Sequence, residues 1–329
     1  TLPQLPAEYA ELNHSIRQLI EAGAEYAAPT AGTNLQPLQL VDLDGDGEEE
    51  ALAFLRRGSD ERALKIYIYE RTEDGYAQSA VIEGSGTAVY SVDYRDLDGD
   101  GRQEILVSWK VGPEMQVLSV FTVRLGTPRE LMNSSYIRYA AADLDGGGRE
   151  EILTFRADEQ GAGTAEYYAW ADDGTLVPAG VARLSMTMAE LSAGQVLSGT
   201  LRGGEPAVFA TGVSDSRVQV TDILALRDGE LGNLTVSDST GVSREIYRYL
   251  GLFPTDIDGD GVTELPVPEE LLSSGDTESG CRIRWRSYDA AGTGETALSA
   301  YHALADGWHA TQFYRNLERE LAELTALFQ

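Results

Sequence analysis

Residues 42 to 50 read Asp-Leu-Asp-Gly-Asp-Gly-Glu-Glu-Glu, and the chain of 329 residues repeats this pattern at residues 96–104 and 256–264. A fourth copy at residues 143–151 keeps the frame but has Gly147 in place of the central carboxylate. Side chains at alternate positions of a tightly curled loop converge, so carboxylates at positions 1, 3, 5 and 9 offer the oxygen ligands that a hard cation prefers. The recurrence therefore predicts a metal-binding loop that is repeated along the chain.

Each complete copy offers four carboxylates and, at position 7, a backbone carbonyl. The predicted ligands are Asp42, Asp44, Asp46, Glu48 and Glu50 in the first copy; Asp96, Asp98, Asp100, Arg102 and Glu104 in the second; and Asp256, Asp258, Asp260, Val262 and Glu264 in the third. The damaged copy offers a weaker set, namely Asp143, Asp145, Arg149 and Glu151. Six or more oxygens suit Ca²⁺ better than Mg²⁺, which keeps its waters. We expect about three structural calcium ions, with a metal-free turn as an equal alternative for the damaged copy.

The sequence around these loops differs from that of an EF-hand. An EF-hand needs a bidentate Glu at position 12 and a helix on each side. The residues at position 12 here carry no carboxylate: Ala53, Val107, Thr154 and Val267. The segments before and after the loops, such as residues 38–41 and 51–55, are short, apolar and rich in strand-forming residues. Each loop is therefore predicted to connect two strands of a hairpin.

The loops recur at long intervals. Their starts at residues 42, 96, 143 and 256 are separated by 54, 47 and 113 residues, so the last interval has room for a worn copy, which we place at residues 198–206. Each unit holds four short strands. In the first unit these are residues 35–42, 50–56, 63–71 and 76–82; in the last they include residues 281–289, 296–304 and 308–313, with a turn at residues 305–307. Repeated four-stranded units predict an all-β protein, a β-propeller of five blades, or of six if two short blades lie near residues 183–250.

The alternation of strand, Asp-x-Asp-Gly-Asp-Gly-x-x-Glu loop and strand resembles the FG-GAP/VCBS repeats of β-propellers, which are relatives of the integrin α-chain propeller. The resemblance covers roughly residues 34–313. It implies calcium in the hairpin between the first and second strands of a blade. The whole chain also resembles VCBS-repeat lipoproteins of Gram-positive gut bacteria, a group that implies no particular activity. This resemblance implies a protein that is secreted or anchored at the cell surface.

Amphipathic helices are predicted at both ends of the chain. The first spans residues 6–22, and its apolar face comprises Tyr9, Leu12, Ile16, Leu19 and Ile20. The second has apolar residues at Leu317, Leu321, Leu324 and Phe328. Both faces need a partner, so we expect the helices to pack on each other or beneath the propeller. The predicted domains are residues 1–28 (helix and linker), 29–313 (propeller) and 314–329 (helix).

Composition narrows the classes of partner. The chain has 25 basic and 54 acidic residues, a net charge of −29, which argues against nucleic acid or an anionic membrane as partner. The single cysteine, Cys281, excludes an internal disulfide framework. The sequence contains no run of 18 or more apolar residues, so no transmembrane segment is predicted. We expect an extracellular monomer, either secreted or a cell-surface lipoprotein whose signal or lipid anchor lies outside this sequence.

Motifs that would indicate catalysis are scarce. The chain has three histidines and no Gly-x-Ser-x-Gly or His-Glu-x-x-His motif, so no catalytic residue is predicted. Basic residues gather in the predicted loops between second and third strands, where they form either a ligand-binding rim or a solvated one: Arg56, Arg57, Lys110, Arg156 and Arg217. The favoured function is a calcium-stabilised binding module for a surface protein or glycan. The alternatives are an extracellular carbohydrate hydrolase or lyase, whose paired carboxylates the sequence cannot single out, and a structural spacer.

Overall fold

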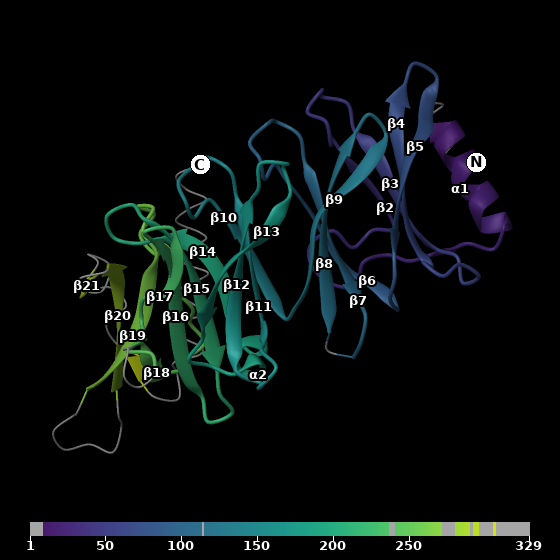
Figure 1. Cartoon of the computed structure of the whole chain (residues 1–329). Helices are drawn as coiled ribbons and strands as arrows, with labels where there is room; N and C mark the ends of the chain where they lie inside the picture. Colours follow the sequence, from purple (N-terminus) through teal and green to yellow (C-terminus); the bar gives the residue numbers. More distant parts are fainter. Residues whose placement is uncertain are drawn as a thin grey trace. The chain divides into compact units, whose positions relative to one another are not determined.

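A computed structural model describes residues 9–113, 115–236, 241–271, 280–289, 292–295 and 305–306. Over these residues the chain is almost entirely β, with strands in five antiparallel sheets and few helices (Figure 1). The predicted fold class, an all-β array of four-stranded units, is confirmed. The chain divides into two compact units: Thr1–Ala141, Gly148–Thr154 and Tyr167–Ala179 form the first, and Ala142–Gly147, Phe155–Glu166 and Gly180–Gln329 the second.

The first sheet is built around two strands that are buried on both faces. It comprises β1 (Glu25–Tyr26), β2 (Leu38–Val41), β3 (Glu50–Arg56), β4 (Leu64–Thr72) and β5 (Gly75–Gly84). Because β3 and β4 each have six consecutive buried residues, their sequences are continuous apolar runs rather than alternating ones. Both β1 and β2 pair with β3, so the segment predicted as a linker up to residue 28 contributes a short strand to the sheet.

The second and third sheets follow the same meander. Their strands are β6 (Ala88–Arg95), β7 (Glu104–Lys110), β8 (Gln116–Arg124) and β9 (Thr127–Tyr136), then β10 (Arg138–Ala142), β11 (Glu151–Ala157), β12 (Gly163–Trp170) and β13 (Leu176–Arg183). In the first unit, Phe54 and Ile66 of the first sheet share one core with Val107 and Trp109 of the second. Burial of these side chains, worth about 1.5–3 kcal/mol each, is the main force that holds neighbouring sheets together.

The fourth and fifth sheets lie in the second unit. Their elements are α2 (Met188–Ser192), β14 (Gln195–Thr200), β15 (Pro206–Val213), β16 (Val218–Arg227), β17 (Glu230–Asn233) and β18 (Ile246–Arg248), then β19 (Glu264–Leu271), β20 (Gly280–Asp289), β21 (Gly292–Glu295) and β22 (Ala305–Asp306). Asp222 of β16 is fully buried and accepts hydrogen bonds from the Ser185 N–H (2.7 Å) and hydroxyl (2.5 Å), which ties the segment after β13 to the fourth sheet.

One predicted turn is wrong. Ala305 and Asp306 form the short strand β22, in which Ala305 pairs with Cys281 of β20. The prediction failed because an Ala-Asp-Gly sequence suits a turn locally, whereas the pairing with β20 is a long-range contact. The strands predicted at residues 296–304 and 308–313 lie outside the described residues, as does the predicted C-terminal helix.

The predicted N-terminal helix is confirmed as α1 (Ala10–Glu21). Its buried residues Leu12 and Ile16 pack on the first sheet against Tyr67, Tyr69 and Tyr76. Gly23 ends the helix in the left-handed conformation (φ +95°) and donates a hydrogen bond to the Ile20 carbonyl. Among the described residues, no helix has the length and apolar character needed to cross a membrane.

Candidate metal centre

The acidic loops occupy the same place in four of the sheets. Residues 42–49, 96–103 and 143–150 connect β2 to β3, β6 to β7 and β10 to β11, as predicted for hairpin loops. Residues 256–263 lead into β19 in the same way, but the strand before them is reduced to a single bridge between Thr255 and Glu264. The loops thus lie at the first turn of each sheet, where two extended segments fix their ends.

The first aspartate makes each loop curl. The Asp42 carboxylate accepts hydrogen bonds from the backbone N–H groups of Gly45 (2.8 Å) and Gly47 (3.0 Å). Asp256 accepts in the same way from Gly259 (2.7 Å) and Gly261 (2.9 Å). The glycines at positions 4 and 6 have positive φ, for example +75° at Gly45 and +90° at Gly47, which residues with a Cβ adopt only under strain. The Asp and Gly pattern therefore encodes the loop conformation as well as its charge.

Curling brings carboxylates together in all four loops. In each group the three side chains offer oxygen atoms that lie within 4.8 Å of one another. The groups are Asp42, Asp44 and Glu50; Asp96, Asp98 and Glu104; Asp143, Asp145 and Glu151; and Asp256, Asp258 and Asp260. The damaged copy thus assembles an acidic cluster without its central carboxylate. Each group could hold a metal ion, because mutually repelling carboxylates at this spacing are favourable ligands for a hard cation.

Other predicted ligands lie outside these groups. Three carboxylates at position 5 accept the backbone N–H of position 7: Asp46 from Glu48 (2.8 Å), Asp100 from Arg102 (2.9 Å) and Asp260 from Val262 (2.8 Å). Asp260 nevertheless belongs to its group, whereas Glu264 does not. At position 7, the side chain of Glu48 lies 3.9 Å from the Arg71 guanidinium, and the Arg149 guanidinium lies over the Trp170 ring at 5.3 Å.

The glutamate at position 9 is the buried member of each complete copy. Glu50 is 6% exposed, and Glu104 and Glu264 are completely buried. One oxygen of each glutamate accepts the backbone N–H of position 2, from Leu43 (2.7 Å), Leu97 (2.9 Å) and Ile257 (3.0 Å). The other oxygen of Glu104 and of Glu264 is buried without a hydrogen-bond partner among the described residues. A buried carboxylate oxygen without a partner is costly, and a cation in the loop would satisfy it.

Burial also changes the proton affinity of these glutamates. It raises the pKa of Glu50, Glu104 and Glu264 to about 7, against an opposing effect of the backbone N–H and with further repulsion from the neighbouring aspartates. Without a cation, each glutamate is therefore close to half protonated near neutral pH. A divalent cation would favour the ionised form, so its binding is coupled to proton release.

Neighbouring loops are hydrogen-bonded to each other in the first unit. The backbone N–H of Gln103 donates to the Leu43 carbonyl (2.8 Å), and that of Glu150 donates to the Leu97 carbonyl (2.7 Å). A Cβ on Gly45 would lie 2.3 Å from the Gly101 carbonyl oxygen, so this glycine permits the close approach. The repeated pattern alone did not predict this role of Gly45. The signal for it was the glycine at position 4 in every copy.

The worn copy has a shorter loop than predicted. β14 extends to Thr200 and β15 begins at Pro206, which leaves residues 201–205 between them, five residues where the acidic loops have eight. The proposed alignment that began at Ser198 is therefore wrong, because it assigned strand residues to the loop. The alignment allowed no gaps, whereas this copy lacks three residues of the loop that curls around the acidic cluster in the other copies. The backbone N–H of Thr263 still donates to the Thr200 carbonyl (2.9 Å).

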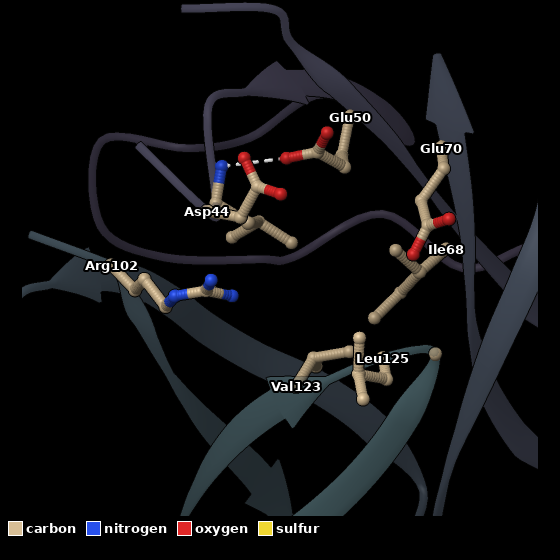
Figure 2. Close-up of a pocket in the computed structure, with 9 residues that line it drawn as sticks. Asp44, Glu50, Ile68, Glu70, Arg102, Val123 and Leu125 are labelled. Carbon is tan, nitrogen blue, oxygen red and sulfur yellow. Dashed lines mark hydrogen bonds between the residues drawn. The ribbon is translucent and has the colours of Figure 1, made fainter. Parts of the chain in front are cut away.

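A small cavity adjoins the cluster of the first loop. Figure 2 shows Asp44 and Glu50 at its edge, Arg102 of the next loop facing them, and Val123 and Leu125 on the opposite wall. Its volume of about 40 Å³ has room for about two or three water molecules. Leu125 is completely exposed, in a turn with positive φ (+49°). Asp44 is itself exposed, so this cluster is open to solvent on one side.

The basic residues of the predicted rim are distributed over both compact units. Arg56, Arg57 and Lys110 belong to the first unit, and Arg156 and Arg217 to the second. Arg156 pairs with Glu166 (2.8 Å), Arg217 lies over the Tyr249 ring (5.3 Å), and Arg56 donates to the Thr87 carbonyl. Arg56 also lines a shallow cavity of about 210 Å³ together with the half-exposed ring of Tyr26.

Comparisons with known proteins support the presence of the repeat and assign no activity to the chain. The sequence matches no curated protein. The solved structures that the chain matches include the exotype rhamnogalacturonan lyase YesX (16% identity, TM-score 0.35, 83% of this chain and 65% of that one), the rhamnogalacturonan lyase YesW (13%, 0.39, 84% and 69%) and the Bacillus licheniformis rhamnogalacturonan lyase PL11 (14%, 0.32, 83% and 57%). The chain thus spans less than two thirds of the length of the first of them. Residues 42–107, which contain the first two acidic loops, match the family model of the FG-GAP-like repeat.

Proposed function

We propose that this chain is a calcium-stabilised extracellular β-propeller module that binds a protein or a glycan at the cell surface. The observation that carries the calcium assignment is the buried glutamate at position 9, whose second oxygen has no partner among the described residues in two of the loops. One of these two glutamates, Glu104, also belongs to an acidic group, in which Asp96 and Asp98 supply further negative charge. The lipoprotein character and the monomeric state that the sequence suggests belong to the same proposal.

The role of the metal is to stabilise the fold. Each of the first three groups joins aspartates from the start of a loop to the glutamate that begins the next strand, so a bound ion cross-links the two ends of the turn. Such a site contributes RT ln(1 + [L]/Kd), which is ~2.7 kcal/mol when free calcium exceeds Kd a hundredfold. Calcium is favoured over magnesium because the loops offer many oxygens in an irregular arrangement rather than an octahedron.

The test is a thermal melt of the full chain in excess EDTA, followed by titration with CaCl₂ and, separately, MgCl₂. We expect the melting temperature to rise by several degrees with calcium and much less with magnesium. Substitutions Asp44→Asn, Asp98→Asn and Asp258→Asn should each remove part of the rise. A melting temperature that calcium leaves unchanged would reject the metal assignment and leave the loops as simple turns.

The binding assignment is supported by the surface around Arg56 in the first unit. Arg56 and the exposed ring of Tyr26 line one shallow cavity, and together they offer hydrogen-bond donors beside an aromatic face. A glycan array probed with the calcium-loaded protein tests it. We expect selective binding that the double substitution Tyr26→Ala and Arg56→Ala weakens. Binding that this double variant retains in full would place the binding surface elsewhere.

A further inference from the structure

The arginine that ends β8 lies over the acidic loop of its own sheet. The Arg124 Nη2 atom is 2.6 Å from Asp100 Oδ2 and 3.5 Å from Asp98 Oδ2. Asp98 is one of the three carboxylates grouped in the loop at residues 96–104. The loop therefore already contains one cation from the protein, within contact distance of a predicted metal ligand.

The same turn of the fourth sheet shows what an arginine can do there. Arg227 ends β16 as Arg124 ends β8, and both are followed by a residue and a glycine with positive φ. Arg227 pairs with Glu205 in the shortened loop at residues 201–205, which contributes to none of the acidic groups. In that sheet the guanidinium pairs with the single carboxylate of the loop, and no metal cluster is formed by the described residues of the sheet. In the second sheet, arginine and metal would share the same carboxylates.

In the other complete loops, no described basic residue forms such a contact with the acidic group. In the loop at residues 42–50, the Arg71 Nε atom lies 3.9 Å from Glu48, which is outside the acidic group. Arg102 faces Asp44 and Glu50 across the small cavity (Figure 2), but it forms no ion pair with either of them. In the loop at residues 256–264, no ion pair between described residues reaches Asp256, Asp258 or Asp260. The three complete loops therefore differ in how an arginine contacts their acidic group. In the second sheet Arg124 contacts a member of the group, in the first sheet Arg71 contacts only a residue outside the group, and in the described part of the fifth sheet no ion pair reaches the group.

We propose that Arg124 sets the metal affinity of the loop at residues 96–104, so that this loop is the weakest of the three complete calcium sites and fills last. This inference rests on the proposed function. A divalent cation that takes Asp98 as a ligand must displace the guanidinium or bind beside a positive charge. Both alternatives weaken binding relative to a loop without that contact.

Isothermal titration of the full chain with CaCl₂, after removal of bound metal, tests the proposal. Asp98→Asn identifies the binding step that belongs to this loop, because that step disappears. In Arg124→Gln the same step should tighten roughly tenfold, because a charge at this distance changes the ionisation equilibrium of a carboxylate by a factor of ten or more. The matched control is Arg227→Gln, which removes the equivalent arginine from the sheet without a metal cluster among its described residues and should leave every step unchanged.

Three results would overturn the proposal. In the first, the calcium-binding step that is lost in Asp98→Asn is the tightest step of the unsubstituted protein. In the second, Arg124→Gln leaves the affinity of that step unchanged. In the third, Arg227→Gln tightens that step as much as Arg124→Gln does. If Arg124→Gln does not fold, as judged by circular dichroism, Arg124→Met and Arg124→Lys replace it: loss of charge in the first should tighten the step, and retained charge in the second should not. Failure of the proposed function gives a different result, since the unsubstituted protein would then show no calcium binding at all.

Discussion

The last residue of each complete loop is also the first residue of a strand. Glu50, Glu104 and Glu264 begin β3, β7 and β19, and their place in a strand buries them. Strand geometry therefore determines the environment of the carboxylate, and the loop determines which charges surround it. The consequence is a group that is partly protonated in the absence of metal and ionised in its presence.

The first prediction concerns pH. The pKa of Glu104 in the folded, metal-free protein is about 7, above its ordinary value of 4.5, so the folded state holds more protons than the unfolded chain between these values. Stability is therefore greatest at the acidic end of this range and is lost as the pH rises through 7. In EDTA we expect the melting temperature to fall by roughly 5 °C between about pH 5.5 and about pH 8. In excess CaCl₂ the fall should shrink or reverse. Equal slopes under both conditions would contradict the prediction.

A single substitution isolates this effect. Glu104→Gln resembles the protonated glutamate. At pH 8 in EDTA, its free energy of unfolding should therefore be about 1 kcal/mol higher than that of the unsubstituted protein, and its melting temperature should be higher as well. It should also lose part of the calcium response. The control is Glu73→Gln, at an exposed position in the turn between β4 and β5. A Glu104→Gln protein that is less stable in EDTA would show that its carboxylate has a favourable partner without metal.

At the scale of elements, the joint between the first two sheets consists of loop backbone. The Leu43 carbonyl accepts from Gln103, and the nearby Gly45 leaves room for the Gly101 carbonyl. A metal that stiffens one loop therefore also stiffens the surface against which the next loop lies. The hydrophobic core between the sheets and this joint are separate contributions to the same interface.

A pair of glycine substitutions tests this joint. Gly45→Ala combines strain from positive φ (+75°) with a clash, because its Cβ would lie 2.3 Å from the Gly101 carbonyl oxygen. Gly47→Ala has only the strain (φ +90°), since its Cβ would meet nothing within 4 Å. We expect Gly45→Ala to lower the free energy of unfolding by about 1–3 kcal/mol more than Gly47→Ala does, measured by urea denaturation in calcium. Equal losses would mean that the close approach contributes nothing.

The sequence predicted those elements whose signal is local. Aspartates at alternate positions predicted the acidic loops, the apolar run at residues 51–55 predicted β3, and the face of α1 that contains Leu12 and Ile16 is the buried one. It did not predict that Ala305 pairs with Cys281, or that Arg124 reaches Asp98, because both contacts join residues that are distant in the chain. The sequence also misplaced the shortened loop. The length of this loop follows from where β14 ends and β15 begins, and the sequence pattern does not show these ends. The binding role of the basic residues remains a prediction.

At the scale of the whole molecule, charge is the dominant feature. The net charge of −29 makes the folded chain repel itself, and three bound calcium ions would return six charges and leave −23. In EDTA, raising NaCl from about 20 mM to about 500 mM should therefore raise the melting temperature by several degrees, because salt screens the repulsion. The rise should be smaller in calcium, which already neutralises the most crowded acids. Tetramethylammonium chloride is the control, and a rise with sodium alone would indicate specific sodium binding instead of screening.

The backbone joint between loops also bears on how such a chain lengthens. The bonds from Gln103 to Leu43 and from Glu150 to Leu97 use only main-chain atoms, so they do not depend on which side chains a copy carries. A tandem gene duplication that adds one unit therefore brings a working donor and a working acceptor with it. The new copy can dock at once, and its acids are then free to drift or disappear. The loop before Pro206 has lost its acidic cluster, yet Thr200 directly before this loop still accepts the bond from Thr263, which fits such a history.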